Sequence, residues 1–329
     1  MSYVSESSPS TAALASAAVQ RLKHAFRPAT LASYTRMFKD FLAFLHLAGV
    51  QIFKVNTILL LSFMEFLHSS GMTHSNVANH MAGIRAMMTI HGLSTQPFKD
   101  DRVALFVKAL KINAPLKPRL GRIITVDLLS QILHQCHSLR DPLMFRALYS
   151  FAFFSILRMS NILPHSSKAF DVSRHLARGD LIFHDSGCTI IIKWSKANQT
   201  RSEINTIVIP ALPRSPLCPV VALKAMFQCY PAGSNDPLFV LKSKEVKSLT
   251  DSIARKHLKA VSVALDIDPP LTFHMFRKSG TTWAFQNGVP VQDLMMHGTW
   301  SSDAIWRYIK SVPSSSSVVS RTFKQHLSS

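Results

Sequence analysis

The stretch FHMFRKSGTTWAFQNGVPVQDLMMHGTWSSDAIWRYI, residues 273–309, carries four side chains of complementary chemistry: His274, Arg277, Trp300 and Tyr308. His274 and Arg277 are three residues apart, so they share a face if the segment is helical. A guanidinium can hold phosphate oxygens, and a tyrosine hydroxyl flanked by cations can act as a nucleophile. These are the groups needed to attack a phosphodiester without a metal ion. The ordinary alternatives are a solvated basic helix face and aromatic residues that only pack.

The composition is that of a folded and strongly basic protein. The 329 residues are 47% hydrophobic and 17% charged, and this length favours two domains. The 37 Lys and Arg residues outnumber the 18 acidic ones, giving a formal net charge of +19. This charge predicts a polyanionic partner with strongly salt-dependent binding, although a basic surface that never meets nucleic acid is the alternative.

The sequence contains no pattern typical of a cofactor site. Its cysteines lack the CxxC or Cys/His spacing of a zinc site, so we expect reduced thiols, no bound metal and no small-molecule cofactor. The four cysteines are Cys136, Cys188, Cys218 and Cys229. No uninterrupted apolar stretch is long enough to span a bilayer, and we therefore expect no membrane partner.

The first part of the chain predicts a helical domain. We expect a disordered tail over residues 1–11 and helices within residues 12–112. The expected features, in order, are apolar periodicity over 31–45, a helix cap at Asn56, another at Thr73 or Ser75, and further periodicity over 103–110.

A basic linker is expected over residues 113–124. The stretch NAPLKPRLGRI contains two prolines and a glycine and lacks helical periodicity, as is typical of a connection between domains. Its Lys117 and Arg119 are suited to contact the phosphates of a DNA backbone.

The second domain, residues 125–329, is expected to be mainly helical with a small antiparallel β-sheet. Thr125 is suited to cap its first helix, and an apolar run from Asp141 predicts a central buried helix that ends near Arg158. The other predicted elements are strands over 189–192 and 204–209 joined by a basic hairpin, helices over 217–230 and 250–265, helices around His274, Gln292 and Asp303, and a terminal helix over 318–327.

With these motifs in this order, the chain resembles the tyrosine recombinase or phage integrase family over nearly its whole length. The stretches SPLCPVVALKAM, FHMFRKSG and HGTWSSDAIWRYI are similar to those of DIRS-like and Crypton-like eukaryotic mobile-element recombinases. The resemblance implies an α+β fold in which a helical core-binding (SAM-like) domain, residues 12–112, precedes a catalytic domain, residues 125–329. The two domains are then expected to form a C-shaped clamp on DNA.

The resemblance also assigns catalytic roles. The tyrosine is the nucleophile, two arginines hold the non-bridging phosphate oxygens, and a lysine in the basic hairpin protonates the leaving 5′ oxygen. The six matched positions are Arg158, Lys196, His274, Arg277, Trp300 and Tyr308. The implied function is that of a site-specific DNA recombinase or integrase that forms a 3′-phosphotyrosyl intermediate without a metal.

Double-stranded DNA is the partner implied by the resemblance, with a homo-tetramer assembled on paired recombination sites. The similarity to eukaryotic mobile-element recombinases implies a nuclear location, whereas a chain from another source would be cytoplasmic. Lys278, which follows the HxxR arginine, is expected to contact the DNA backbone rather than to react.

Several assignments have alternatives. Lys193 competes with Lys196 for the role of general acid, but alternation along the strand predicts that Lys193 directs its charge outward, where it would contact DNA. Asn161 occupies a position at which the family commonly carries an acidic residue that braces the site. Trp300 is expected either to donate its indole N–H to phosphate or to pack the site dry, and His297 is an alternative for the polar role.

Two other functions remain compatible with the residues. Asn161 favours a catalytically silent DNA-binding protein derived from a mobile element, because a neutral amide cannot compensate the charge of an arginine. A monomeric topoisomerase would share the cleavage chemistry but would relax DNA without pairing two sites.

Overall fold

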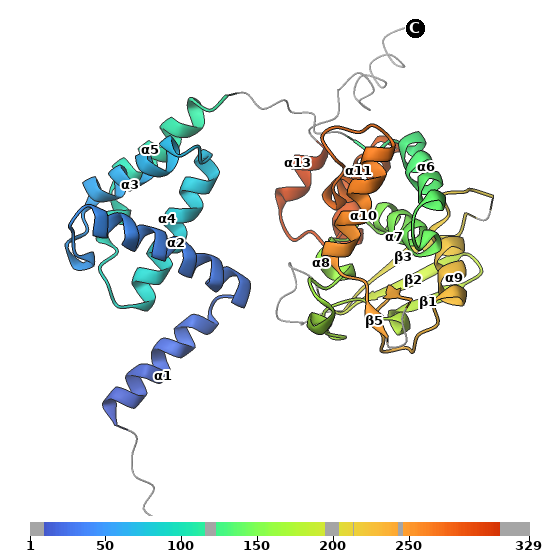
Figure 1. The fold of residues 1–329 in the computed structure, drawn as a ribbon, viewed down its shortest axis with the longest axis horizontal. Coiled ribbons are helices and arrows are strands. Elements are labelled where there is room, and N and C mark those ends of the chain that lie inside the picture. The colour runs from blue at the N-terminus through green and yellow to red at the C-terminus, as the bar shows by residue number, and fades with distance from the viewer. Residues whose placement is uncertain (1–9, 116–122, 195–203, 213, 243–245, 310–329) are drawn as a thin grey trace, which may run out of the picture. The chain divides into compact units, whose positions relative to one another are not determined.

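The computed structural model describes residues 10–115, 123–194, 204–212, 214–242 and 246–309. The chain divides into two compact units, Met1–Lys117 and Pro118–Ser329 (Figure 1). Among the helices of these described ranges, none combines the length and the apolar character needed to cross a membrane.

The first unit is a bundle of helices whose starts follow from local capping. The side chain of Asn56 accepts a hydrogen bond from the backbone N–H of Leu59, and Thr73, rather than Ser75, caps the next helix through the N–H of Asn76. Both caps satisfy amide groups that a helix start leaves without partners. The helices are α1 (Thr11–His24), α2 (Pro28–Leu47), α3 (Thr57–Ser69), α4 (His74–Ile90) and α5 (Asp101–Ile112).

The core of the first unit lies where α2 packs on α4 and α3 contacts both α4 and α5. Phe41, Phe63, Met64 and Ile84 are fully buried there. The rings of Phe41 and Phe63 meet at a centroid distance of 5.0 Å, which is within the usual range for tilted aromatic pairs. The unit therefore has a hydrophobic core of its own.

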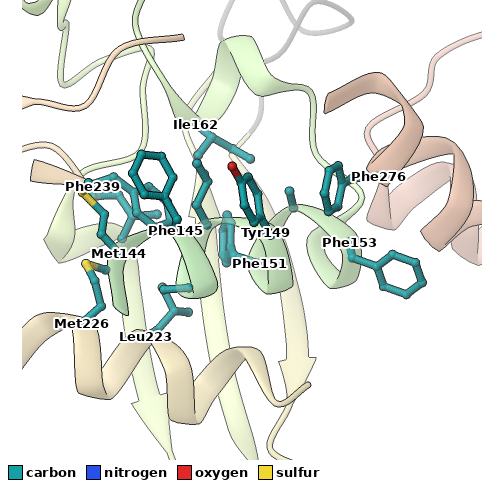
Figure 2. Close-up of a cluster of buried hydrophobic side chains, with 14 of the residues drawn as sticks. Met144, Phe145, Tyr149, Phe151, Phe153, Ile162, Leu223, Met226, Phe239 and Phe276 are labelled. Atoms are coloured by element: carbon teal, nitrogen blue, oxygen red, sulfur yellow. The ribbon is translucent and has the colours of Figure 1, made fainter. Parts of the chain in front are cut away.

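The second unit is built around one buried helix, α7 (Pro142–Ser155). Figure 2 shows Phe145, Tyr149 and Phe151 of this helix inside the core, with Leu223 and Met226 of α9 (Pro219–Cys229) close by. The helix α6 (Val126–Gln135), capped by Thr125 as expected, also packs against α7. Burial of these apolar side chains is the main stabilising contribution to this unit.

The predicted central helix stops earlier than the apolar pattern suggests. It ends at Ser155 because Ile156 adopts a left-handed backbone conformation with φ 54°. Arg158 therefore lies outside α7 and precedes the short helix α8 (Met159–Ile162). The chain changes direction at this break, so Arg158 does not continue the axis of α7.

A three-stranded antiparallel sheet packs against α7 and α9. Its strands are β1 (Leu181–His184), β2 (Gly187–Ile192) and β3 (Asn205–Pro210), in that spatial order. The predicted pairing of residues 189–192 with 204–209 is confirmed, with Ile190 opposite Ile207. The sequence prediction missed β1 and a two-stranded ribbon formed by β4 (Val240–Leu241) and β5 (Lys247–Ser248). The fold class, mainly α with a small antiparallel sheet, is confirmed.

The remaining helices complete the second unit. They are α10 (Asp251–Ala264), α11 (Phe273–Gln286), α12 (Val291–His297) and α13 (Trp306–Ile309). Helix α11 lies so close to α7 that a Cβ at Gly280 would come within 2.2 Å of the carbonyl oxygen of Phe153. Glycine is therefore required at this crossing. The predicted terminal helix over 318–327 lies outside the described residues.

Candidate active site

Helices α11 and α13 bring His274 and Tyr308 together. The Tyr308 hydroxyl lies 3.2 Å from Nε2 of His274, and the two ring centroids are 5.4 Å apart. The Thr282 hydroxyl, about two turns further along α11, lies 3.4 Å from the backbone carbonyl oxygen of Tyr308. The tyrosine is thus held against the helix that carries the HxxR motif.

Arg277 is the most deeply buried charged group of the site, with a relative exposure of 2%. One terminal nitrogen donates to the carbonyl oxygen of Ile156 at 2.5 Å, and the other donates to that of Gly298 at 2.8 Å. Each terminal nitrogen carries a second hydrogen. The guanidinium is therefore fixed in orientation by backbone carbonyls and still has donors for a phosphate.

Burial lowers the pKa of Arg277 to about 9, and the nearby positive charge of Arg158 acts in the same direction, whereas Tyr308 opposes the shift. A buried cation with a like-charged neighbour is unfavourable on its own. An anion placed between the two arginines would relieve both costs. The arrangement is therefore suited to a phosphate.

Arg158 is half-buried and contacts the residue that follows Gly298, whose carbonyl holds Arg277. It lies 3.4 Å from the carbonyl oxygen of Thr299, a weak contact that leaves most of its donors uncommitted. Burial lowers its pKa, and Tyr308 partly offsets this effect. Both family-matched arginines thus interact electrostatically with Tyr308, in agreement with a shared site.

Two of the three carbonyls that contact the arginines belong to residues with a strained backbone. Ile156 and Thr299 both have positive φ values, 54° and 56°. This region is unfavourable for β-branched residues and costs about 1–2 kcal/mol per residue. Strained backbone of this kind is often found at functional sites. The sequence contains no glycine or asparagine at either position to indicate these turns.

Trp300 covers the buried arginine. Its ring lies 3.6 Å from the guanidinium carbon of Arg277 and meets Tyr308 edge-on at a centroid distance of 5.4 Å. A Cβ at Gly298 would come within 1.7 Å of the Trp300 ring, so the glycine makes room for the indole. Of the two expected roles, the geometry favours packing of the site by Trp300 through a cation–π contact.

His274 has an environment that favours its neutral form. Although His274 is exposed to solvent, partial desolvation by neighbouring protein atoms lowers its pKa, and the charges of Arg277, Arg158 and Lys278 act in the same direction. A neutral imidazole can accept a proton, which an imidazolium cannot. Lys278 is half-exposed on α11, and its positive charge is one of those that lower the pKa of His274.

Two residues with alternative roles are engaged elsewhere. Lys193 does not direct a free charge outward as expected, because its ammonium lies 2.8 Å from a carboxylate oxygen of Asp180. His297 lies 3.1 Å from the carbonyl oxygen of Phe154 in α7, and burial lowers its pKa. Lys117, Arg119 and Lys196 lie outside the described residues, so their predicted roles stay predictions.

Asn161, in α8, is almost fully buried. Its side-chain amide donates to the carbonyl oxygen of Trp194 at 2.6 Å. This contact links the helix that follows Arg158 to the segment that follows β2. Sequence reasoning identified Asn161 only as a departure from the family pattern and missed its partner. Across the described part of the chain, no cluster of three or more His, Cys, Asp or Glu side chains is arranged to hold a metal ion.

Family models match both units of the chain. The model of the phage integrase family matches residues 122–312. The model of the phage integrase SAM-like domain matches residues 12–90. No curated protein matches the chain.

Solved structures with the same fold are distant in sequence. The integrase of transposon Tn1549 in complex with circular intermediate DNA is 13% identical, with a TM-score of 0.61, covering 92% of this chain and 98% of its own. The XerH site-specific recombinase bound to difH substrate is 15% identical, with a TM-score of 0.56, covering 85% of this chain and 75% of its own. A lambda integrase dimer bound to a COC′ core site is 12% identical, with a TM-score of 0.52 and coverages of 88% and 75%.

The family match covers more than half of the chain and includes every described residue of the cluster around Tyr308. Together with the SAM-like match to the first unit, it identifies the chain as a member of the phage integrase (tyrosine recombinase) family.

Proposed function

We propose that the protein is a site-specific DNA recombinase or integrase that cleaves and rejoins DNA through a 3′-phosphotyrosyl intermediate. The observation that carries this proposal is the position of the Tyr308 hydroxyl 3.2 Å from His274, with Arg158 and Arg277 near enough for Tyr308 to influence the pKa of both. Preorganised cations stabilise the charge that develops on a phosphate under attack.

The chemistry requires no cofactor. The Tyr308 oxygen attacks the phosphorus while its proton passes to Nε2 of neutral His274, and the bond from phosphorus to the 5′ oxygen breaks. Lys196 supplies a proton to that leaving oxygen. One phosphodiester bond is exchanged for another, so attack by a 5′ hydroxyl reverses the step and rejoins the DNA. Arg158 and Arg277 hold the non-bridging oxygens throughout.

Double-stranded DNA is the substrate that the charge supports. The net charge of +19 favours binding to a polyanion, and the similar integrase and recombinase structures contain DNA. Within the proposed complex, Lys117, Arg119 and Lys278 contact backbone phosphates. Because such contacts release counterions, affinity falls by about 10³ to 10⁵ between roughly 50 and 200 mM salt if six to ten phosphates are contacted.

We also propose how the protein assembles on DNA and from which kind of element it derives. The SAM-like and catalytic domains form a C-shaped clamp on the duplex, and four copies assemble on two recombination sites. The stretches SPLCPVVALKAM and HGTWSSDAIWRYI support an origin in a DIRS-like or Crypton-like mobile element and, with it, a nuclear location.

A covalent trapping experiment tests the proposed function without knowledge of the target site. The protein is incubated with a pool of random-sequence duplexes, each nicked so that a short 5′-hydroxyl fragment diffuses away after cleavage. We expect wild-type protein to retain DNA through denaturation, and sequencing of that DNA to reveal the target. Tyr308→Phe should retain none, whereas Tyr34→Phe, in α2 of the first unit, should behave as wild type.

Three outcomes would overturn the proposal. An adduct that persists in Tyr308→Phe would identify another nucleophile. Sequence-specific binding by wild-type protein without any adduct would instead identify a catalytically silent DNA-binding protein, the alternative that Asn161 motivates. Relaxation of arbitrary plasmids without recombination would identify a topoisomerase.

A further inference from the structure

Two turns of the second unit carry groups of the active site. The α7 turn, residues 154–158, is the end of α7 with the residues that follow it, and it contributes the carbonyl of Ile156 and the side chain of Arg158. The α12 turn, residues 298–300, follows α12 and contributes the carbonyl of Gly298. The positions of both arginines therefore depend on how these two turns are placed against each other.

The α12 turn is closed by backbone hydrogen bonds to its own helix. Its three N–H groups donate, in order, to the carbonyl oxygens of Leu294, Met296 and Met295 at 2.9, 3.1 and 2.9 Å. Such bonds commonly close the C-terminus of a helix around a left-handed residue, which here is Thr299. Any contact that fixes the end of α12 therefore also fixes the carbonyl of Gly298.

Two of the contacts between the turns are made by the arginines themselves. Arg277 binds the carbonyls of Ile156 and Gly298 with its two terminal nitrogens. Arg158 adds its 3.4 Å contact with the carbonyl of Thr299. The charge of Arg158 lowers the pKa of Arg277, because two cations in proximity repel each other. These contacts therefore join the turns only by bringing like charges together.

A third contact joins the turns without a charge. Nε2 of His297, the last residue of α12, lies 3.1 Å from the carbonyl oxygen of Phe154 in the last turn of α7. A carbonyl only accepts, so this nitrogen carries a hydrogen. Partial burial lowers the pKa of the imidazole, and the ring is thus neutral near pH 7. His297 therefore adds a donor but no third positive charge.

The carbonyl that His297 binds is one for which the helix provides no amide. The last four carbonyl groups of a helix have no intrahelical partner, and Phe154 immediately precedes Ser155, the final residue of α7. Two residues further along the chain, the carbonyl of Ile156 binds Arg277. The imidazole thus binds the end of α7 close to the point at which that helix holds the buried arginine.

We propose that His297 is a positioning residue for the two arginines: its neutral imidazole holds the α7 turn and the α12 turn at the spacing that directs Arg277 and Arg158 to one phosphate. This inference rests on the proposed function and deepens it, since it gives His297 a supporting role in place of contact with the phosphate. The imidazole of His297 itself takes part in no proton transfer.

Side-chain amides of two lengths test the bond to Phe154. The amide nitrogen of Gln is as many bonds from the backbone as Nε2 of His, whereas that of Asn is one bond closer. We expect His297→Gln to keep the bond and to remain within about tenfold of the wild-type cleavage rate. His297→Asn and His297→Leu lose it and should be slower by about 10²-fold, the usual consequence of misplacing a catalytic group by about 1 Å.

These rates are measured in single turnovers at saturating DNA that carries the site identified by covalent trapping. A double-mutant cycle then separates positioning from an independent role. If His297 acts through the placement of the arginines, the loss of Arg277 removes most of what it supports. His297→Asn should therefore slow Arg277→Ala by less than about tenfold, whereas independent losses would multiply.

A neutral substrate gives a second readout. In a methylphosphonate, a methyl group replaces one non-bridging oxygen of the scissile phosphate, so the negative charge that the arginines balance is removed. On this substrate the defect of His297→Asn relative to wild type should shrink by about tenfold or more. The defect of His274→Gln should not shrink, because acceptance of the tyrosine proton is still required.

His68→Leu is the matched control for His297→Leu. Nδ1 of His68 also lies near a backbone carbonyl oxygen, that of Met72 at 3.3 Å, but His68 is exposed on α3 of the first unit. The control should cleave both substrates at the wild-type rate. If melting curves show that His297→Leu does not fold, His297→Asn, which keeps a polar side chain, decides the question.

Four results would overturn the inference while wild-type protein is active. They are wild-type rates in the variants of His297 that lose the donor, a His297→Gln as slow as His297→Asn, multiplied losses in the double variant, and an undiminished defect on the methylphosphonate. If wild-type protein forms no covalent adduct with any DNA, the proposed function itself fails, and the inference fails with it.

Discussion

The hydroxyl of Tyr308 lies 3.2 Å from Nε2 of His274, although 34 residues separate them in sequence. The contact places a weakly acidic O–H beside an imidazole whose pKa is lowered by partial desolvation and by neighbouring positive charges. These charges keep the imidazole neutral near pH 7. His274 is thus prepared to accept the proton that Tyr308 loses on attack.

The pH dependence of cleavage should follow the protonation of His274. Because its pKa lies below the ordinary value of 6.5, the imidazole is neutral above that range and protonated below it. The rate of adduct formation should therefore fall as the pH is lowered, with a midpoint below 6.5. Single-turnover rates between about pH 5 and 8 measure this profile. His274→Gln should be slower and lack this acid limb, and persistence of the limb would exclude His274 as the acceptor.

Replacement of each arginine by lysine should separate structural from catalytic contributions. Arg277→Lys cannot reach both Ile156 and Gly298 with one ammonium group, so it should lower the free energy of unfolding by about 1–3 kcal/mol. Arg158→Lys loses only a 3.4 Å contact and should cost less than about 1 kcal/mol. Both should slow cleavage by about 10²-fold or more. Urea denaturation and single-turnover cleavage measure the two effects, and equal stability losses would contradict the assignment.

Substitution of Trp300 should show whether it packs or donates. Trp300→Phe keeps a ring over Arg277 and should remain within about tenfold of the wild-type cleavage rate, since the cation–π energy at stake is about 1 kcal/mol. Trp300→Ala removes a buried indole and should cost about 3–5 kcal/mol of stability. If Trp300→Phe is stable yet as inactive as Trp300→Ala, the indole N–H donates to phosphate instead.

Gly280→Ala should displace Arg277, although Gly280 itself is not part of the site. The added methyl would meet the carbonyl oxygen of Phe153 at 2.2 Å, so α11 must move away from α7 at a cost of about 1–3 kcal/mol. This movement carries Arg277 away from the carbonyl of Ile156, and both the melting temperature and the cleavage rate should fall. Gly92→Ala, in the first unit and in open space, should lower stability through its positive φ without slowing the chemical step.

Local features of the fold were predictable because their causes are local. Caps at Asn56, Thr73 and Thr125 involve side chains that bond to amides three residues away, and the β-branched run in β2 pairs as expected. Strand β1 was missed because its sequence, LIFH, lacks the run of β-branched residues that indicated β2. The end of α7 was misplaced because Ile156 adopts a left-handed conformation that its residue type does not favour.

By itself, the sequence determined the fold class, the charge that attracts a polyanion, and which side chains have the chemistry for phosphoryl transfer. Helical spacing even placed His274 and Arg277 on one face. Only the tertiary structure decided which backbone groups the site's side chains bind: Arg277 binds the carbonyls of Ile156 and Gly298, and Asn161 binds that of Trp194. These contacts join backbone groups to residues far away in sequence, and a backbone carbonyl has no residue-specific signature.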